Sequence, residues 1–169
     1  WLNVQAKYKG SVEKAEFNTI ITSDVGKIDA GGSFNLDSLS ALRGVNASLG
    51  ITDLDVGYLL GKPDSVMGTL GMRARVQSNG LVPEEMTATL NAFVDHFQFK
   101  GYTYNDLNIV GSLEDETLLA TASMAEENLA FTLDAGYSFG DEVPVYTVTM
   151  DLKNANFRNL NLSSSPIRA

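Results

Sequence analysis

The stretch Leu70-Gly-Met-Arg-Ala-Arg-Val76 alternates apolar residues with glycine or arginine at every position. Successive side chains of an extended chain point to opposite faces, whereas a helix would repeat its apolar residues every three or four positions. The stretch therefore predicts a β-strand with Arg73 and Arg75 on one face and an apolar row on the other. That row consists of Leu70, Met72, Ala74 and Val76.

The same alternation recurs along most of the chain. Two further apolar rows are Met86, Ala88, Leu90 and Ala92, and Leu129, Phe131 and Leu133. Additional strands are predicted at 2–8, 15–22, 27–34, 45–52, 96–100, 105–113, 117–124 and 145–152. Short turn sequences such as Ser78-Asn79-Gly80 and Lys100-Gly101 separate them, which is typical of antiparallel hairpins.

Three short helical turns are predicted between strands, at 37–42, 55–60 and 83–86. Asp37-Ser38 can cap the first turn, Gly61 and then Pro63 end the second, and Pro83 suits the first helical position of the third. None is long enough to form a layer, so the sequence predicts an all-β protein with little helix.

One-sided strands need something to cover their apolar face. The sheet could fold over as a closed sandwich, close as a barrel, or curl into an elongated, curved antiparallel sheet of the β-taco kind. In that last form the apolar inner face is a groove. We expect the curved, groove-like sheet.

Two short motifs occur twice in the same order, roughly a hundred residues apart. Gly10-Ser-Val-Glu13 returns as Gly111-Ser-Leu-Glu114, and Asp29-Ala-Gly-Gly-Ser-Phe34 returns as Asp134-Ala-Gly-Tyr-Ser-Phe139. The repeats predict a first module over 1–100 and the start of a similar module over 101–169, in a fragment of a longer protein.

Composition excludes several classes of function. The net charge of -9, without a basic cluster, argues against nucleic-acid partners. The absence of cysteine removes disulfides and thiolate metal sites, and no apolar run reaches the roughly 20 residues of a membrane-spanning helix.

Catalytic motifs are missing, so we expect no enzyme, no cofactor and no metal. The single histidine, His96, has no nucleophile or second ligand near it in sequence and is expected to have a structural role. Glu84-Glu85 is read as a helix start rather than an acid/base pair, and 114–116 and 126–127 as solvated loops rather than calcium sites.

Two further groups of side chains leave alternatives open. Arg73 and Arg75 could bind a phosphate headgroup, although a solvated outer face is favoured. Tyr102-Thr-Tyr104, with Phe97 and Phe99, could form an aromatic platform for sugars, although packing at a strand corner is favoured.

Several stretches resemble TamB proteins of Bacteroidetes-type bacteria, which belong with the AsmA-like proteins. They are Asp55-Val-Gly-Tyr-Leu-Leu-Gly61, Met67-Gly-Thr-Leu-Gly71, Ser78-Asn-Gly80, 97–111 with its Gly-Tyr-Thr-Tyr core, and 145–162. The resemblance covers most of the chain as a diffuse pattern of glycines, aromatic residues and asparagines.

The resemblance implies a middle segment of a periplasmic protein that is anchored in the inner membrane and spans the periplasm. It implies a long sheet whose apolar trough carries phospholipid acyl chains to the outer membrane. It also implies a role in outer-membrane assembly with a barrel partner of the TamA kind, contacted through other parts of the full protein.

A lipid track and a closed β-sandwich acting as a structural or adhesive module both need one apolar face. The sequence alone does not separate them. The residues predicted to line a lipid track are Leu70, Met72, Ala74, Val76, Met86, Ala88, Leu90, Ala92, Leu129, Phe131 and Leu133.

Overall fold

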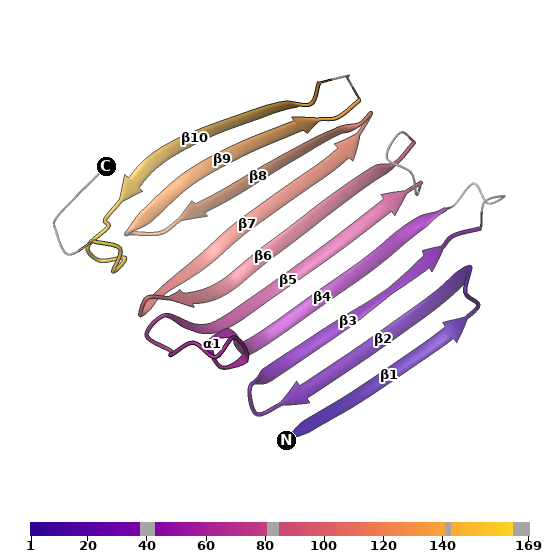
Figure 1. The fold of residues 1–169 in the computed structure, drawn as a ribbon, viewed down its shortest axis with the longest axis horizontal. Coiled ribbons are helices and arrows are strands. Elements are labelled where there is room, and N and C mark those ends of the chain that lie inside the picture. Colours follow the sequence, from indigo (N-terminus) through magenta and orange to yellow (C-terminus); the bar gives the residue numbers. More distant parts are fainter. Residues whose placement is uncertain (38–42, 81–84, 141–142, 164–169) are drawn as a thin grey trace.

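The structure is a computed structural model that describes residues 1–37, 43–80, 85–140 and 143–163. Its ten strands follow one another across a single antiparallel sheet in chain order, and the sheet is open, since β1 and β10 do not pair (Figure 1). The all-β, antiparallel prediction is confirmed. The strands are β1 (Leu2–Gly10), β2 (Lys14–Ser23), β3 (Gly26–Asn35), β4 (Gly44–Asp55), β5 (Met67–Asn79), β6 (Thr87–Phe99), β7 (Tyr102–Glu114), β8 (Thr117–Ala125), β9 (Leu129–Ser138) and β10 (Val145–Ala155).

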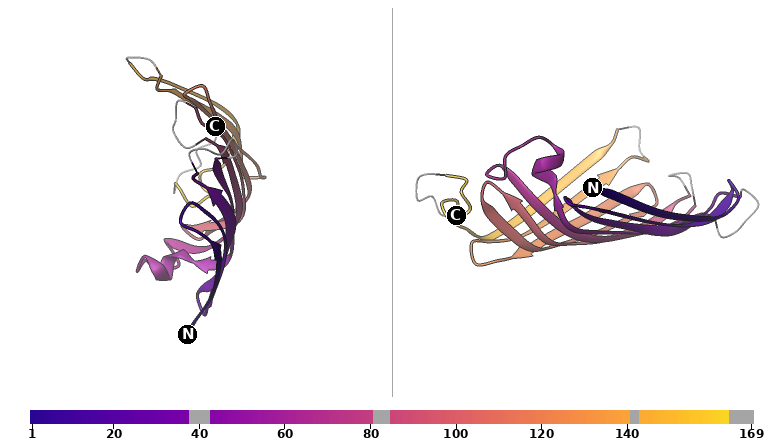
Figure 2. Two further views of the ribbon diagram at one scale, coloured as in Figure 1. Left: turned by 90° about the vertical axis from the view of Figure 1, so that its right-hand side faces the viewer. Right: turned by 90° about the horizontal axis from the view of Figure 1, so that it is seen from below.

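The sheet is one curved layer of strands, as the two side views show (Figure 2). Five of the nine connections between strands are turns of two or three residues, which return the chain to the adjacent position in the sheet. The four longer connections do the same, so each strand pairs only with its neighbours in sequence.

One helical turn, α1 (Val56–Leu59), interrupts the strands after β4. Asp55 caps it, since its Oδ1 accepts a hydrogen bond from the backbone N–H of Tyr58 at 2.8 Å. The predicted turn at 55–60 is confirmed. Residues 38–42 of the turn predicted at 37–42, and residues 83 and 84 of the turn predicted at 83–86, lie outside the described residues. No helix in the described part of the chain has the length and apolar character to cross a membrane.

Strand register places the predicted apolar rows on a common face. Val76 pairs with Leu90 and Ala74 pairs with Ala92, while Arg73 and Arg75 pair with Phe93 and Asn91 on the opposite face. The row of Ala92 continues through Ile109 and Ala122 to Leu133. Residues that pair directly across antiparallel strands share a face, so the predicted parity is confirmed. Met86 precedes β6, and the register does not place it.

The strand predicted at 96–100 is instead the second half of β6. The pairing of β5 with β6 shifts register between Gly71 and Met72, which leaves Asp95 as an extra residue on β6. In β7 the facing position is Asp106, whose φ of 57° is left-handed. A bulge of this kind twists the strand and changes which residues lie on each face of the sheet.

The repeated Asp-Ala-Gly motif lies on the second strand of a hairpin in both places. Asp29–Phe34 lies within β3, and Asp134–Phe139 covers the end of β9 and the residue after it. The strand arrangement is therefore repeat-like. The sheet continues without a break across residue 100, and the division into modules at 1–100 and 101–169 stays a prediction.

Position 44, the first residue of β4, requires glycine because of its backbone conformation. Its φ is +152°, and a Cβ there would lie 2.0 Å from the carbonyl oxygen of Ser78. We expect Gly44→Ala to lower the opening free energy of β4 and β5 by about 1–3 kcal/mol, measured by amide hydrogen exchange.

Gly50 in the same strand is the matched control. A Cβ at Gly50 meets its nearest atoms, in Asp29, at 3.9 Å, which is ordinary contact. Gly50→Ala should leave the exchange rates of β4 and β5 nearly unchanged, and equal effects at the two glycines would contradict this account.

A candidate apolar binding face

The predicted rows belong to an apolar surface that spans the sheet. Cross-strand pairs link one residue of each strand into rows that run perpendicular to the strands. One such row is Val4, Ile21, Ile28, Ile51, Met72, Val94 and Leu107. We call the surface formed by these rows the apolar face, and the opposite surface the polar face.

The described residues supply no second layer over the apolar face. Only five hydrophobic residues are buried among them: Ala15, Ala92, Met124, Ala155 and Leu160. Toward the edges of the sheet the side chains are open to solvent; Val4 is 55 % exposed and Val148 70 %. This is a large amount of exposed hydrocarbon for a soluble surface, and such patches mark binding sites.

A cavity of about 250 Å³ lies on the apolar face where β6, β7, β8 and β9 meet. The residues that line it are Val94, Phe97, Phe99, Tyr104, Leu107, Met124, Leu129 and Phe131. Leu129 and Phe131 belong to the predicted track. Val94 and Phe97 line the same cavity although they are three residues apart, because the bulge at Asp95 brings both onto one face.

Aromatic rings shape one end of this cavity. The rings of Phe97 and Phe99 stack with centroids 6.2 Å apart, and Tyr102 and Tyr104 meet edge to face at 4.8 Å. The four aromatic residues singled out in the sequence thus pack at a strand corner, as favoured there, and all of them except Tyr102 also line the cavity.

Hydrogen bonds hold the side chain of Tyr102 in place at the start of β7. The Tyr102 hydroxyl donates to Glu126 Oε2 at 2.9 Å and accepts from Asn128 Nδ2 at 3.4 Å. Glu126 Oε1 accepts the backbone N–H of Asn105. Glu126 is therefore a structural hydrogen-bond acceptor that ties the β8–β9 turn to β7.

Burial raises the pKa of Tyr102 and of Tyr104, and the Glu126 and Glu127 carboxylates raise the pKa of Tyr102 further. A raised pKa in the folded state means that the fold holds its phenol protons at pH values where the unfolded chain loses them. The stabilisation is therefore fully present below about pH 10 and is lost as the pH rises through the folded-state pKa.

We therefore expect the free energy of unfolding to fall as the pH rises above about 10. The slope of that fall should be smaller in the variant Tyr102→Phe/Tyr104→Phe. Urea denaturation followed by circular dichroism at a series of pH values measures it. Identical slopes in the two proteins would show that these phenols are not linked to folding.

The chain after β10 forms a turn that fastens this end of the sheet. Asn159 Nδ2 donates to Asn128 Oδ1 at 2.8 Å, and Asn161 Nδ2 donates to the carbonyl oxygen of Lys100 at 2.9 Å. Leu160 between them is fully buried, with 0 % exposure. The turn thus bridges the β6–β7 and β8–β9 hairpins.

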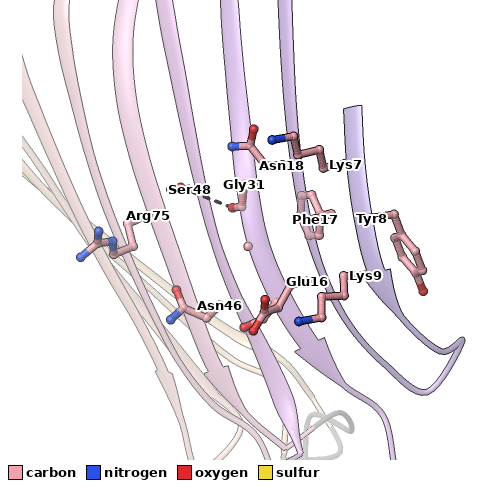
Figure 3. A pocket seen from close by; sticks show the side chains of 12 residues that line it. Lys7, Tyr8, Lys9, Glu16, Phe17, Asn18, Gly31, Asn46, Ser48 and Arg75 are labelled. Atoms are coloured by element: carbon pink, nitrogen blue, oxygen red, sulfur yellow. Dashed lines mark hydrogen bonds between the residues drawn. The ribbon is translucent and has the colours of Figure 1, made fainter. Parts of the chain in front are cut away.

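The polar face has shallow depressions of a different character. One of about 450 Å³ is lined by Lys7, Asn18, Glu16 and Arg75, over Gly31, whose carbonyl oxygen accepts from Ser48 Oγ at 3.3 Å (Figure 3). Cationic, anionic and amide side chains surround the backbone of Gly31 and Gly32. This is the pattern of a hydrated outer surface rather than of a site for one ligand.

The other polar residues singled out in the sequence lie apart from one another. His96 Nε2 lies 3.3 Å from Asp53 Oδ1, Arg73 donates to Asp95 at 2.8 Å, and Glu85 lies 3.8 Å from Arg43. Within the described ranges no three His, Asp or Glu side chains come close enough to hold a metal ion. Glu84 lies outside those ranges.

Sequence reasoning missed most of the cavity lining. Val94, Phe97, Phe99, Tyr104, Leu107 and Met124 were not among the predicted track residues. For Phe97, Phe99 and Tyr104 the missing information is the change of parity at Asp95 and Asp106, which strict alternation does not anticipate. A signal was present, because an acidic residue interrupts the apolar pattern at facing positions of two consecutive strands, and Asp tolerates left-handed backbone.

Comparison with known proteins returned no matching family model, no matching curated protein and no matching solved structure.

Proposed function

We propose that this chain is a non-enzymatic segment of a periplasmic lipid-transport protein of the TamB and AsmA-like kind. In this proposal the apolar face carries phospholipid acyl chains between the inner and outer membranes. The observation that carries the proposal is the cavity on the open apolar face, which hydrocarbon side chains and aromatic rings line.

Curvature supports the assignment of the apolar face to the inner side of the trough. In Figure 2, α1 and the turn after β10 project from the hollow side of the sheet. Ala155, which pairs with Leu129 on the apolar face, is buried where that turn begins. The apolar face would then be the concave side of the sheet, where a hydrophobic ligand is less exposed to water.

The chemistry of the face suits a moving acyl chain. Burial of each methylene group contributes about 0.8 kcal/mol, and it has no directional requirement. Rows of Leu, Ile, Val, Met and Ala repeat from strand to strand, so an acyl chain finds similar contacts at each step. A barrel partner of the TamA kind would be contacted by other parts of the full protein.

The alternative is a structural or adhesive module whose apolar face is only a core. The described residues form one open sheet, so a closed sandwich would need its second sheet from another polypeptide segment. In that case the face would contact protein and exclude lipid.

A photoreactive residue separates the two functions. We would replace Leu107, which lines the cavity, with a benzophenone amino acid, irradiate cells and identify the adduct by mass spectrometry. Asn108, the next residue and exposed on the polar face, is the matched control. A phospholipid adduct at 107 and none at 108 supports transport. Protein adducts alone at 107 would leave the structural module as the better account.

A further inference from the structure

Three depressions on the polar face, none of which is by itself a site for one small ligand, join into a groove. The depression of about 450 Å³ described above shares Ser48 and Arg75 with a second of about 460 Å³, and it shares Asn46 with a third of about 690 Å³. The polar-face residues of β4 line all three in turn, from Gly44 to Gly50. Six residues at about 3.3 Å each give the groove a length of about 20 Å.

The groove follows β3 and β4 because the polar-face side chains in the middle of these strands are short. The residues of its floor are Gly31, Ser33, Ser48 and Gly50. Longer side chains stand on both sides of the floor, from β1 and β2 on one side and from β5 on the other. Figure 3 shows Lys7 and Lys9 on one side of Gly31 and Arg75 on the other. Lys7 and Arg75 are the two ends of one cross-strand row that passes through Gly31.

The groove is mostly cationic, although the net charge of the chain is -9. Only two acidic side chains line the three depressions, those of Glu16 and Asp29. The cationic residues that line them are Lys7, Lys9, Lys14, Arg43, Arg73 and Arg75. The sequence shows no basic cluster because these residues are spread along the chain, and strand pairing brings them together. A hollow lined mainly by one sign of charge concentrates groups of the opposite sign.

Most of these cations are available to an anion. Arg73 donates to Asp95 at 2.8 Å and Arg43 lies 3.8 Å from Glu85, so two of the six already have a partner. The other four are exposed and have no ion-pair partner among the described residues; they are Lys7, Lys9, Lys14 and Arg75. A ligand with several anionic groups could therefore bind without displacing an existing ion pair.

Amide side chains complement the cations. Asn18, Asn46 and Gln77 line the groove, and their side chains form no hydrogen bond with another described residue. An amide both donates and accepts hydrogen bonds, so it suits hydroxyl groups, which also do both. The backbone of the floor is already paired between β3 and β4, so a peptide in the groove would have only these side chains for its own backbone groups. An anionic polymer rich in hydroxyl groups fits better than an acidic peptide.

We propose that the groove on the polar face binds an acidic polysaccharide. The four unpaired cations hold its anionic groups, and the amides bond to its hydroxyl groups. The polymer lies along β3 and β4, on the opposite side of the sheet from the apolar face. This binding is a separate property of the chain and does not depend on lipid transport.

Titration with acidic and neutral polysaccharides tests the proposal. We would use alginate, which carries carboxylates, dextran sulfate, and uncharged dextran, and follow binding by isothermal titration calorimetry at low salt. The proposal expects binding of at least one acidic polymer, no binding of dextran, and a loss of affinity as sodium chloride is added, because salt screens the charges. No binding of either acidic polymer, or equal binding of dextran, would overturn it.

Removal of two unpaired cations locates the binding. Lys7→Gln/Arg75→Gln changes exposed residues, so the fold should be retained, and affinity for the acidic polymer should fall about tenfold or more. Lys62→Gln/Lys153→Gln is the matched control, because it changes the net charge equally at exposed positions outside the groove. This control should bind like the unchanged protein. Equal weakening in the two variants would mean that net charge, and not the groove, governs binding.

Glu16 provides a test of opposite sign. Its carboxylate lies in the groove and repels a polyanion, so Glu16→Gln should tighten binding by about threefold. Unchanged or weaker binding contradicts the proposal.

Polyglutamate separates the two classes of anionic polymer. Because its backbone amides lack hydroxyl groups, it should bind more weakly than the better acidic polysaccharide, and Asn18→Ala/Asn46→Ala should weaken only the polysaccharide. Polyglutamate that binds equally well would show that the groove selects charge alone, and the assignment to a polysaccharide would then be wrong.

Discussion

Leu90→Asp and Phe131→Asp are each expected to abolish the phospholipid adduct at position 107 while leaving the sheet folded. Leu90 pairs with Val76 on the apolar face, and Phe131 lines the cavity. A carboxylate in a hydrocarbon environment costs about 2.5–3.5 kcal/mol by insertion measurements, and about 3 kcal/mol corresponds to a loss of lipid contact of roughly a hundredfold.

The fold should survive because the face is open. Both side chains are only half-buried, so an aspartate there can keep part of its hydration. We expect a loss of about 1 kcal/mol in the free energy of unfolding, measured by urea denaturation. If a second layer covered the face, the same charge would be enclosed without a partner, and the loss would be several times larger.

Thr89→Asp is the matched control for Leu90→Asp. Thr89 is the adjacent residue and is exposed, and it pairs with Gln77 and Ser112 on the polar face. Lipid adducts in this variant should equal those of the unchanged protein. Loss of the adduct in all three variants would mean that net charge, and not the apolar face, governs lipid contact.

Leu160→Ala is expected to release the turn after β10. Leu160 is the largest fully buried side chain among the described residues. Replacement of a buried leucine by alanine costs about 2–5 kcal/mol, which is comparable with the stability of a short turn. Amide protons of Leu160 and Leu162, which bond to Asn156 and Phe157, should therefore lose their protection from exchange.

The control for this prediction lies two residues further along the chain. Leu162 is 41 % exposed, and Leu162→Ala should change the exchange of these amides by well under a factor of ten. Retained protection in Leu160→Ala would show that the asparagine hydrogen bonds alone fasten the turn.

The sequence predicted the architecture because its dominant signal is local. Alternation such as that at 70–76 gives both the strand and the face of each residue, and the short turns favour a meander. The helical turn predicted at 55–60 followed from Gly61 and Pro63, which end it. These features depend on residues that are close together in the chain.

The cavity could not be predicted in the same way, because it depends on pairing between strands. The bulge at Asp95 becomes visible only when β6 is set against β5, and it decides that Phe97 lies with Val94. Likewise, the role of Glu126 depends on Tyr102 and Asn105, which are far from it in sequence. Alternation carries no information about either relation.

Each strand pairs only with the strands that precede and follow it in the sequence, and this affects how the chain folds. Every strand can complete one ladder as soon as the following strand is present, so structure can grow one hairpin at a time from either end. A chain delivered gradually, for instance during export through a membrane, could therefore fold behind the point of emergence. By the same logic, damage at one strand should melt its neighbours and leave distant hairpins intact.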